Sequence, residues 1–256
     1  MIHVSYSVSI RDKIVLVVGG AGGIGSAAAR HFAASGAKVV ITHRVGANKA
    51  AAANAILATL EGDGHAAFAA DVEDTQSLIA LHDEIVGRYA RLDILVNTAG
   101  FTEPVPHSDL DALNDDLIDR MFRVNWRGQF AAVRTFASLL KASGDGLVVS
   151  LSSIAGTTGA GSSIAYCAAK AGIDVMTKSL ARALAPQIRV LGVSPGVVET
   201  GFVEGRGPDF NAKTAATTPL ERVATADDVA AAILSCATHL AFSTGTTIVV
   251  DGGRSL

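Results

Sequence analysis

Residue types that would mark several other classes of protein are scarce in this sequence. The 256 residues include only 2 cysteines, too few for a disulfide framework or a structural zinc site. A formal net charge of −3 gives no support to binding of nucleic acid or of an anionic membrane. Only 6 prolines are present, so Pro-rich linkers are not expected. These scarcities favour a globular protein in a reducing compartment, and we expect a cytoplasmic location.

Long hydrophobic runs are also missing. Every apolar run is interrupted well before the roughly 18 residues that a membrane-spanning helix needs. The first residues, 1–5, show no charged region followed by an apolar stretch, so no secretion signal is expected. Hydrophobic residues nevertheless make up 49% of the chain and charged residues 18%, which predicts a folded chain rather than a disordered one.

Short apolar runs alternate with longer Ala-rich segments along the whole chain. Most of the runs are uniformly apolar, as strands covered on both faces should be. We predict strands at 14–18, 39–42, 66–70, 94–97, 147–151, 190–194 and 247–250. Helices are predicted near 23–35, 47–61, 74–89, 111–142, 162–185 and 226–238. This alternation predicts an α/β fold with one doubly wound, seven-stranded parallel sheet in a single domain over 1–256.

A glycine-rich turn follows the first predicted strand directly and precedes the first helix. Its residues are Gly19, Gly20, Ala21, Gly22, Gly23, Ile24 and Gly25. Backbone N–H groups in such a turn approach a pyrophosphate at a helix N-terminus. The glycines fit two registers, 20/22/25 and 19/23/25. We therefore predict a dinucleotide site here, against the alternative of a glycine turn without a ligand.

The end of the second strand indicates which dinucleotide is bound. An acidic residue there would bond the ribose 2′-hydroxyl of NAD, whereas an arginine accepts the 2′-phosphate of NADP. The sequence has Thr42, His43 and Arg44 and no carboxylate. We therefore predict NADP, with NAD left open because Arg44 also fits a solvated surface arginine.

Tyr166 and Lys170 lie four residues apart on a predicted helix and share one face. A neighbouring ammonium favours the phenolate of a tyrosine, so this pair is a candidate proton-transfer device. Ser153 lies just past a strand end, where a parallel sheet opens into the crevice that binds ligands. We predict that the Ser153 hydroxyl holds a carbonyl oxygen of the substrate.

Motifs in this order resemble the short-chain dehydrogenase/reductase family, in particular members that reduce 3-oxoacyl groups on a carrier protein. The resemblance runs from Gly19 to Gly253 and selects the 19/23/25 glycine register. The matching positions are Asp71 with Val72, Asn97-Thr98-Ala99-Gly100, Asn125, Ser153, Tyr166, Lys170, Pro195-Gly196, Val198 and Thr200. Val18 and Thr98 depart from the family pattern, which has Thr and Asn there. The resemblance implies a Rossmann-type fold and a homotetramer, or less often a dimer.

The resemblance also implies roles for these residues. Tyr166 exchanges the proton at the substrate oxygen, Lys170 supports Tyr166 and binds the nicotinamide ribose, and Ser153 polarises the carbonyl. Asn125 anchors a water next to Lys170. The cofactor-binding set is Gly19, Ala21, Gly22, Gly23, Ile24, Gly25, His43, Arg44, Asp71, Val72, Asn97, Ala99, Gly100, Tyr166, Lys170, Pro195, Gly196, Val198 and Thr200. No metal site is expected, because the histidines show no ligand spacing.

Some of these residues also have simpler interpretations. Asp71 fits a cap for the helix that begins near residue 74. Asn125 fits an ordinary surface asparagine, although its place inside a long predicted helix favours a functional kink. Residues 201–218 are interpreted as a substrate lid. Within the lid and beside it, Phe101, Phe202 and Phe210 are expected to shape the pocket, with Arg206 and Lys213 as candidate anion contacts.

The predicted function is an NADP(H)-dependent oxidoreductase that interconverts a carbonyl and a secondary alcohol. The alternatives are an NAD-dependent alcohol, sugar or steroid dehydrogenase of the same family, and a non-catalytic dinucleotide-binding sensor. The partner is expected to be a small molecule, not a nucleic acid or a membrane. The sequence does not identify the substrate.

Overall fold

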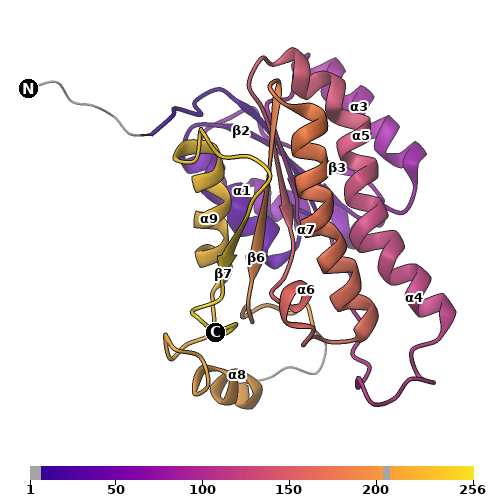
Figure 1. Ribbon diagram of the computed structural model, residues 1–256. Coiled ribbons are helices and arrows are strands. Elements are labelled where there is room, and N and C mark those ends of the chain that lie inside the picture. The colour runs from indigo at the N-terminus through magenta and orange to yellow at the C-terminus, as the bar shows by residue number, and fades with distance from the viewer. Residues whose placement is uncertain (1–6, 204–207) are drawn as a thin grey trace, which may run out of the picture.

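The computed structural model describes residues 7–203 and 208–256, and a single parallel sheet forms their centre (Figure 1). Its strands lie in the order β3-β2-β1-β4-β5-β6-β7. Their bounds are β1 Ile14–Val18, β2 Lys38–His43, β3 Ala66–Ala69, β4 Ile94–Asn97, β5 Gly146–Leu151, β6 Ile188–Pro195 and β7 Thr247–Val250. The predicted seven-stranded, doubly wound α/β fold is therefore confirmed, with strand ends shifted by at most two residues.

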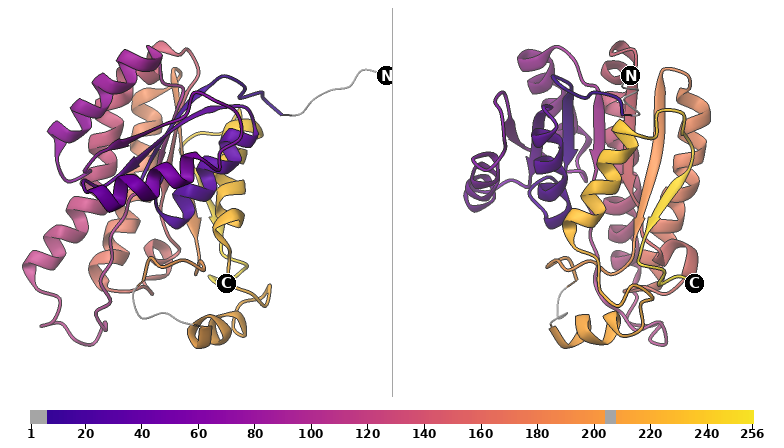
Figure 2. Two further views of the ribbon diagram at one scale, coloured as in Figure 1. Left: turned by 180° about the vertical axis from the view of Figure 1, so that it is seen from behind. Right: turned by 90° about the vertical axis from the view of Figure 1, so that its left-hand side faces the viewer.

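Helices cover both faces of the sheet (Figures 1 and 2). On one face pack α1 Gly23–Ala34, α2 Ala47–Leu57 and α9 Ala226–Thr238. On the other face pack α3 Thr75–Tyr89, α5 Gly128–Ala142 and α7 Ile164–Leu184. Small alanines of α1, such as Ala28, are fully buried against the strands, so the Ala-rich composition allows helix and sheet to approach closely.

The helix predicted over 111–142 is in fact three elements. These are α4 Asp115–Phe122, a π-helical turn η1 Arg123–Arg127, and α5. Two short helices that were not predicted also appear, α6 Ala155–Thr158 and α8 Pro208–Ala215. The apolar periodicity continues from Leu117 through Met121 to Val124, so the sequence pattern does not reveal the extra residue of a π turn.

The carboxyl ends of the strands meet at one end of the molecule, the lower end in Figure 1, where α6 and α8 also lie. The chain passes from β1 to β2 on one side and later returns to β4 on the other side of β1. Ligands of doubly wound sheets bind in the crevice beyond this reversal point. Among the residues described, no helix is long and apolar enough to cross a membrane.

Candidate active site

The glycine turn between β1 and α1 is closely packed against the rest of the sheet end. Gly19 has φ +83°, and a Cβ there would lie 2.6 Å from the backbone nitrogen of Ala99. A Cβ on Gly25 would lie 2.3 Å from the carbonyl oxygen of Gly19. These two glycines are therefore required by the turn itself, whether or not a ligand binds.

Gly22 and Gly23, by contrast, are exposed at the start of α1. Gly22 is the N-cap, carries no side-chain cap, and is followed by a first turn without an acidic residue. The first N–H groups of α1 therefore face outward without a capping side chain, as a pyrophosphate site requires. This geometry fits a dinucleotide, which these residues would hold through their backbone.

Two threonines brace the turn where the sequence departs from the family pattern. The hydroxyl of Thr42 on β2 accepts a hydrogen bond from the Gly19 backbone nitrogen at 2.9 Å. The hydroxyl of Thr98 donates to the Val18 carbonyl at 2.9 Å. The turn therefore has hydrogen-bonded supports despite the departures at Val18 and Thr98. Sequence reasoning missed Thr42, because its role depends on the register between β1 and β2.

At the end of β2, Arg44 is exposed and follows His43, whose Nδ1 lies 2.8 Å from the Arg44 carbonyl oxygen. On the neighbouring strand end, Asp71 accepts a hydrogen bond from the Glu73 backbone nitrogen. The N-cap of α3 is instead Asp74, so the interpretation of Asp71 as the cap of this helix is wrong. Contact of Asp71 and Val72 with an adenine stays a prediction.

Ser153, Tyr166 and Lys170 come together at the ends of β5 and α7. Ser163 is the N-cap of α7, and its hydroxyl accepts from the Tyr166 backbone nitrogen at 3.2 Å. One turn on, the Lys170 Nζ lies 5.6 Å from the centre of the Tyr166 ring. The Ser153 hydroxyl accepts from the Ala155 N–H at 3.2 Å, which leaves its own hydrogen for another acceptor.

Lys170 is a buried ammonium. Its side chain is only 3% exposed, and Nζ donates to the Leu151 carbonyl oxygen at 2.8 Å. Burial lowers the pKa of Lys170 to about 8, while the charge of Asp174, one turn further along α7, opposes this shift. A lysine in this state titrates close to neutral pH, as lysines at functional sites do.

Asn125 lies inside the π turn and is fully buried. Its Nδ2 donates to the carbonyl oxygens of Phe101, at 2.8 Å, and Met121, at 2.9 Å. Its Oδ1 accepts from the Phe101 backbone nitrogen at 3.2 Å. The helix is irregular at Asn125, where the sequence predicted a kink: the amide takes up backbone groups at the π turn and joins them to the loop after β4.

The segment after β6 reaches the glycine turn across the crevice. Pro195 ends β6, and Val198 forms an isolated parallel bridge with Ala224. A Cβ on Gly23 would lie 2.8 Å from Cγ2 of Thr200, so these two predicted cofactor residues are in contact. The predicted Asn97 lies differently: the residue is only 1% exposed within β4, and its contact with a cofactor stays a prediction.

Of the aromatic side chains expected to shape the pocket, Phe202 lies beside Tyr166, and their contact with a substrate stays a prediction. The Phe202 ring centre is 6.3 Å from that of Tyr166, and the Arg120 guanidinium lies 4.0 Å from the centre of the Phe101 ring. Phe210 is half-buried on α8 and Lys213 is exposed there. Arg206 lies outside the residues that the structure describes.

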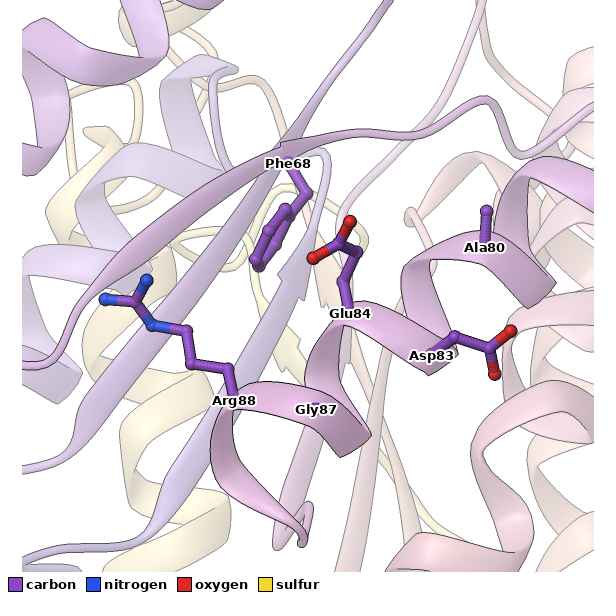
Figure 3. Close-up of a pocket in the computed structure, with 6 residues that line it drawn as sticks. All are labelled: Phe68, Ala80, Asp83, Glu84, Gly87 and Arg88. Carbon is purple, nitrogen blue, oxygen red and sulfur yellow. The ribbon is translucent and has the colours of Figure 1, made fainter.

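A separate hollow of about 650 Å³ lies between β3 and α3. Phe68, Glu84 and Arg88 face one another across it (Figure 3). None of the predicted site residues lines it. Among the described residues there is also no group of three His, Cys, Asp or Glu side chains placed to hold a metal ion.

Comparison with known proteins covers nearly the whole chain. The family model described as Enoyl-(Acyl carrier protein) reductase matches residues 19–255. A cis-4-hydroxycyclohexanecarboxylate dehydrogenase of Sinomonas cyclohexanicum is 36% identical, over 94% of this chain and 96% of its own. The 3-oxoacyl-(acyl-carrier-protein) reductase of Escherichia coli is 32% identical, over 96% of this chain and 98% of its own. A short-chain type dehydrogenase/reductase of Mycobacterium ulcerans superposes with a TM-score of 0.88 at 27% identity, over 97% of this chain and 91% of its own.

Proposed function

Because the chain belongs to the short-chain dehydrogenase/reductase family, and is thus an NAD(P)-dependent oxidoreductase, we propose that it interconverts a carbonyl compound and a secondary alcohol with NADP(H). One observation carries this proposal: Lys170 lies beside the Tyr166 ring next to the strand end that holds Ser153. The catalytic set would be Asn125, Ser153, Tyr166 and Lys170. Membership in a family of named dehydrogenases favours this function over a non-catalytic sensor.

The side chains at the crevice divide the proposed reaction among them. A nicotinamide bound in the crevice would supply or accept the hydride. The Ser153 hydroxyl donates a hydrogen bond to the substrate oxygen, and Tyr166 gives that oxygen its proton in reduction or removes it in oxidation. The Lys170 ammonium stabilises the phenolate form of Tyr166 and presents N–H donors toward the cofactor ribose.

Replacing Tyr166 with Phe removes the proton-transfer group and keeps the ring. We expect the Tyr166→Phe variant to lose about 10³-fold in kcat on a ketone found in a substrate panel, since general acid–base catalysis supplies 10²–10⁴-fold. Tyr89→Phe is the matched control, because the Tyr89 hydroxyl bonds the Gly64 carbonyl far from the crevice. Near-wild-type turnover by Tyr166→Phe would refute the mechanism.

The preference for NADP over NAD is supported by the charge at the end of β2. Arg44 is exposed there, and the loop from Thr42 to Gly46 contains no carboxylate. A guanidinium matches the geometry of a phosphate, whereas an NAD site places a carboxylate on the ribose. Fluorescence titration with NADPH and NADH tests this assignment, and tighter binding of NADH would overturn it.

The substrate entry is proposed to lie under residues 201–218 of the single domain. Helix α8 in this segment is joined to the chain end, since the Arg254 guanidinium donates to Thr214, Thr217 and Thr218. Figure 2 shows α8 and the C-terminus at the same end of the molecule. The segment is therefore anchored at its far end, as a lid over the substrate requires.

A homotetramer is the proposed assembly, with a dimer as the simpler form. Exposed apolar side chains support it: Val175 on α7 is 61% exposed, and Val249 on β7 is 52% exposed. Helix α7 covers one face of the sheet and strand β7 forms its edge, so each offers a separate surface for an interface. Sedimentation equilibrium at micromolar concentration measures the assembly, and a monomer would contradict it.

A further inference from the structure

A second side chain shares the carbonyl oxygen that holds Lys170. Gln129 lies in the first turn of α5, one helical turn after Asn125, and is only 2% exposed. Its Nε2 donates to the Leu151 carbonyl oxygen at 3.3 Å, the same atom that accepts from Lys170 Nζ at 2.8 Å. A carbonyl oxygen has two lone pairs, so it accommodates both donors. Gln129 is therefore connected to the candidate active site from inside the protein.

Several buried polar atoms of Gln129 and of the strands beneath α5 have no hydrogen-bond partner among the residues that the structure describes. They are Oε1 of Gln129, Oγ of Ser150, and both Oδ1 and Nδ2 of Asn97. Asn97 and Ser150 stand opposite each other in the register of β4 and β5, and each is 1% exposed. Helix α5 packs directly over these two strands. Donors and acceptors are therefore gathered under the start of α5, next to the Leu151 carbonyl.

Such a set is costly if it stays unsatisfied. An unpaired buried polar group destabilises the fold, and folded proteins commonly satisfy such groups with ordered water that makes about three hydrogen bonds. Asn97, Ser150 and Gln129 offer both acceptors and donors, which is what a bound water needs. An apolar side chain at any of the three positions would bury no polar group. Three polar residues together therefore indicate that a polar molecule is bound between them.

We propose that Asn97, Ser150 and Gln129 enclose buried water on the interior side of Lys170, and that Gln129 is a positioning residue for Lys170. The water dipoles solvate the buried ammonium, and the Gln129 amide holds the Leu151 carbonyl in place for it. Since Ser153 follows Leu151 by two residues, the same contact fixes the strand end that carries the serine. The effect on catalysis rests on the proposed function, whereas the water site itself does not.

Among the residues that the structure describes, two titratable groups interact with Lys170, and both lie on α7. They are the ring of Tyr166 and the carboxylate of Asp174. From β5 and α5 the described contacts are neutral, namely the Leu151 carbonyl and the Gln129 amide. A change at Gln129 therefore acts on Lys170 through solvation and position rather than through a charge.

Gln129→Met tests the proposal, because Met has a similar length and no hydrogen-bonding amide. We expect the melting temperature to fall by about 3 °C or more, because the proposed water loses the Gln129 amide as a partner. We also expect the alkaline limb of the kcat pH profile to move down by about half a pH unit, since lost solvation disfavours the ammonium. Val133→Ala, one turn along the same buried face of α5, is the control that lowers stability without moving the limb.

The outcomes separate the water site from the proposed function. A high-resolution crystal structure with water within hydrogen-bonding distance of Gln129 Oε1 supports the site, and its absence there overturns it. A Gln129→Met variant that is as stable as the wild type, or more stable, also overturns the water site. Such a result would mean that the amide oxygen has no partner to lose, so its removal does not destabilise the fold. An unmoved pH limb in an active enzyme overturns the positioning role alone. If the wild type turns over no ketone, the proposed function fails. The crystal structure and the melting temperatures still decide whether the water site exists.

Discussion

The two ends of the candidate cofactor site hold their cations in opposite ways. At the catalytic end Lys170 is buried on α7, bonded to a backbone carbonyl, and its pKa is lowered to about 8. At the adenosine end Arg44 is exposed at the end of β2. Burial makes a cation chemically adjustable and costly to the fold, whereas exposure leaves it a permanent charge weakened by solvent. The first arrangement suits proton transfer and the second suits recognition of an anion.

The largest effect is expected from Lys170→Met, which removes the buried cation and keeps the length of the side chain. We expect kcat to fall by about 10²-fold or more, because Tyr166 loses the charge that stabilises its phenolate. At pH 7 the free energy of unfolding should rise in the cofactor-free protein, because the cost of burying an ammonium disappears.

The pH dependence of stability sharpens this prediction. In the unfolded chain Lys170 has its ordinary pKa of 10.5, while in the folded chain its pKa is about 8. Between pH 8 and 10.5 the unfolded state binds the additional proton, so the contribution of Lys170 to stability improves as pH rises, by about 3 kcal/mol at most. Denaturant unfolding across this range should show the rise in the wild type and not in Lys170→Met. Equal slopes in both proteins would contradict the buried ammonium.

Much of this site could be predicted from the sequence, because the relevant signals are local. Uniformly apolar runs identified the strands, and the glycine turn and the Tyr166–Lys170 spacing identified the two ends of the crevice. The contributions of Thr42 and Gln129 could not be predicted, since their partners, Gly19 and Leu151, depend on strand register and on helix packing. The π turn at Asn125 could not be predicted for a related reason: one extra residue leaves the apolar pattern of a helix almost unchanged.

A smaller effect is expected at the exposed cation. Arg44→Ser should weaken NADPH binding by about 10-fold at low salt and leave NADH binding unchanged, because only NADPH carries the 2′-phosphate. The difference should shrink as salt is added, since an exposed charge is screened over roughly 10 Å at 0.1 M. Titration with both cofactors at two salt concentrations measures this, with Lys49→Ser, in the first turn of the neighbouring α2, as the comparison. Equal losses of NADPH and NADH affinity would remove Arg44 from the phosphate site.

The smallest effect is expected from Asp174→Asn, which changes a charge near Lys170 and almost nothing else. The Asp174 carboxylate raises the pKa of Lys170 against the effect of burial, and its Oδ1 accepts from the Thr247 hydroxyl at 3.0 Å. An amide keeps that acceptor and loses the charge, so the pKa of Lys170 should fall below 8 and the alkaline limb of the kcat profile should move down by about half a pH unit. Thr247→Val is the matched control, because it removes the hydrogen bond and keeps the carboxylate. If Thr247→Val moves the limb as far as Asp174→Asn does, local packing rather than charge sets the protonation of Lys170. If only Asp174→Asn moves it, the buried cation is adjusted by a carboxylate one helical turn away, whereas the exposed Arg44 has no need of such a partner.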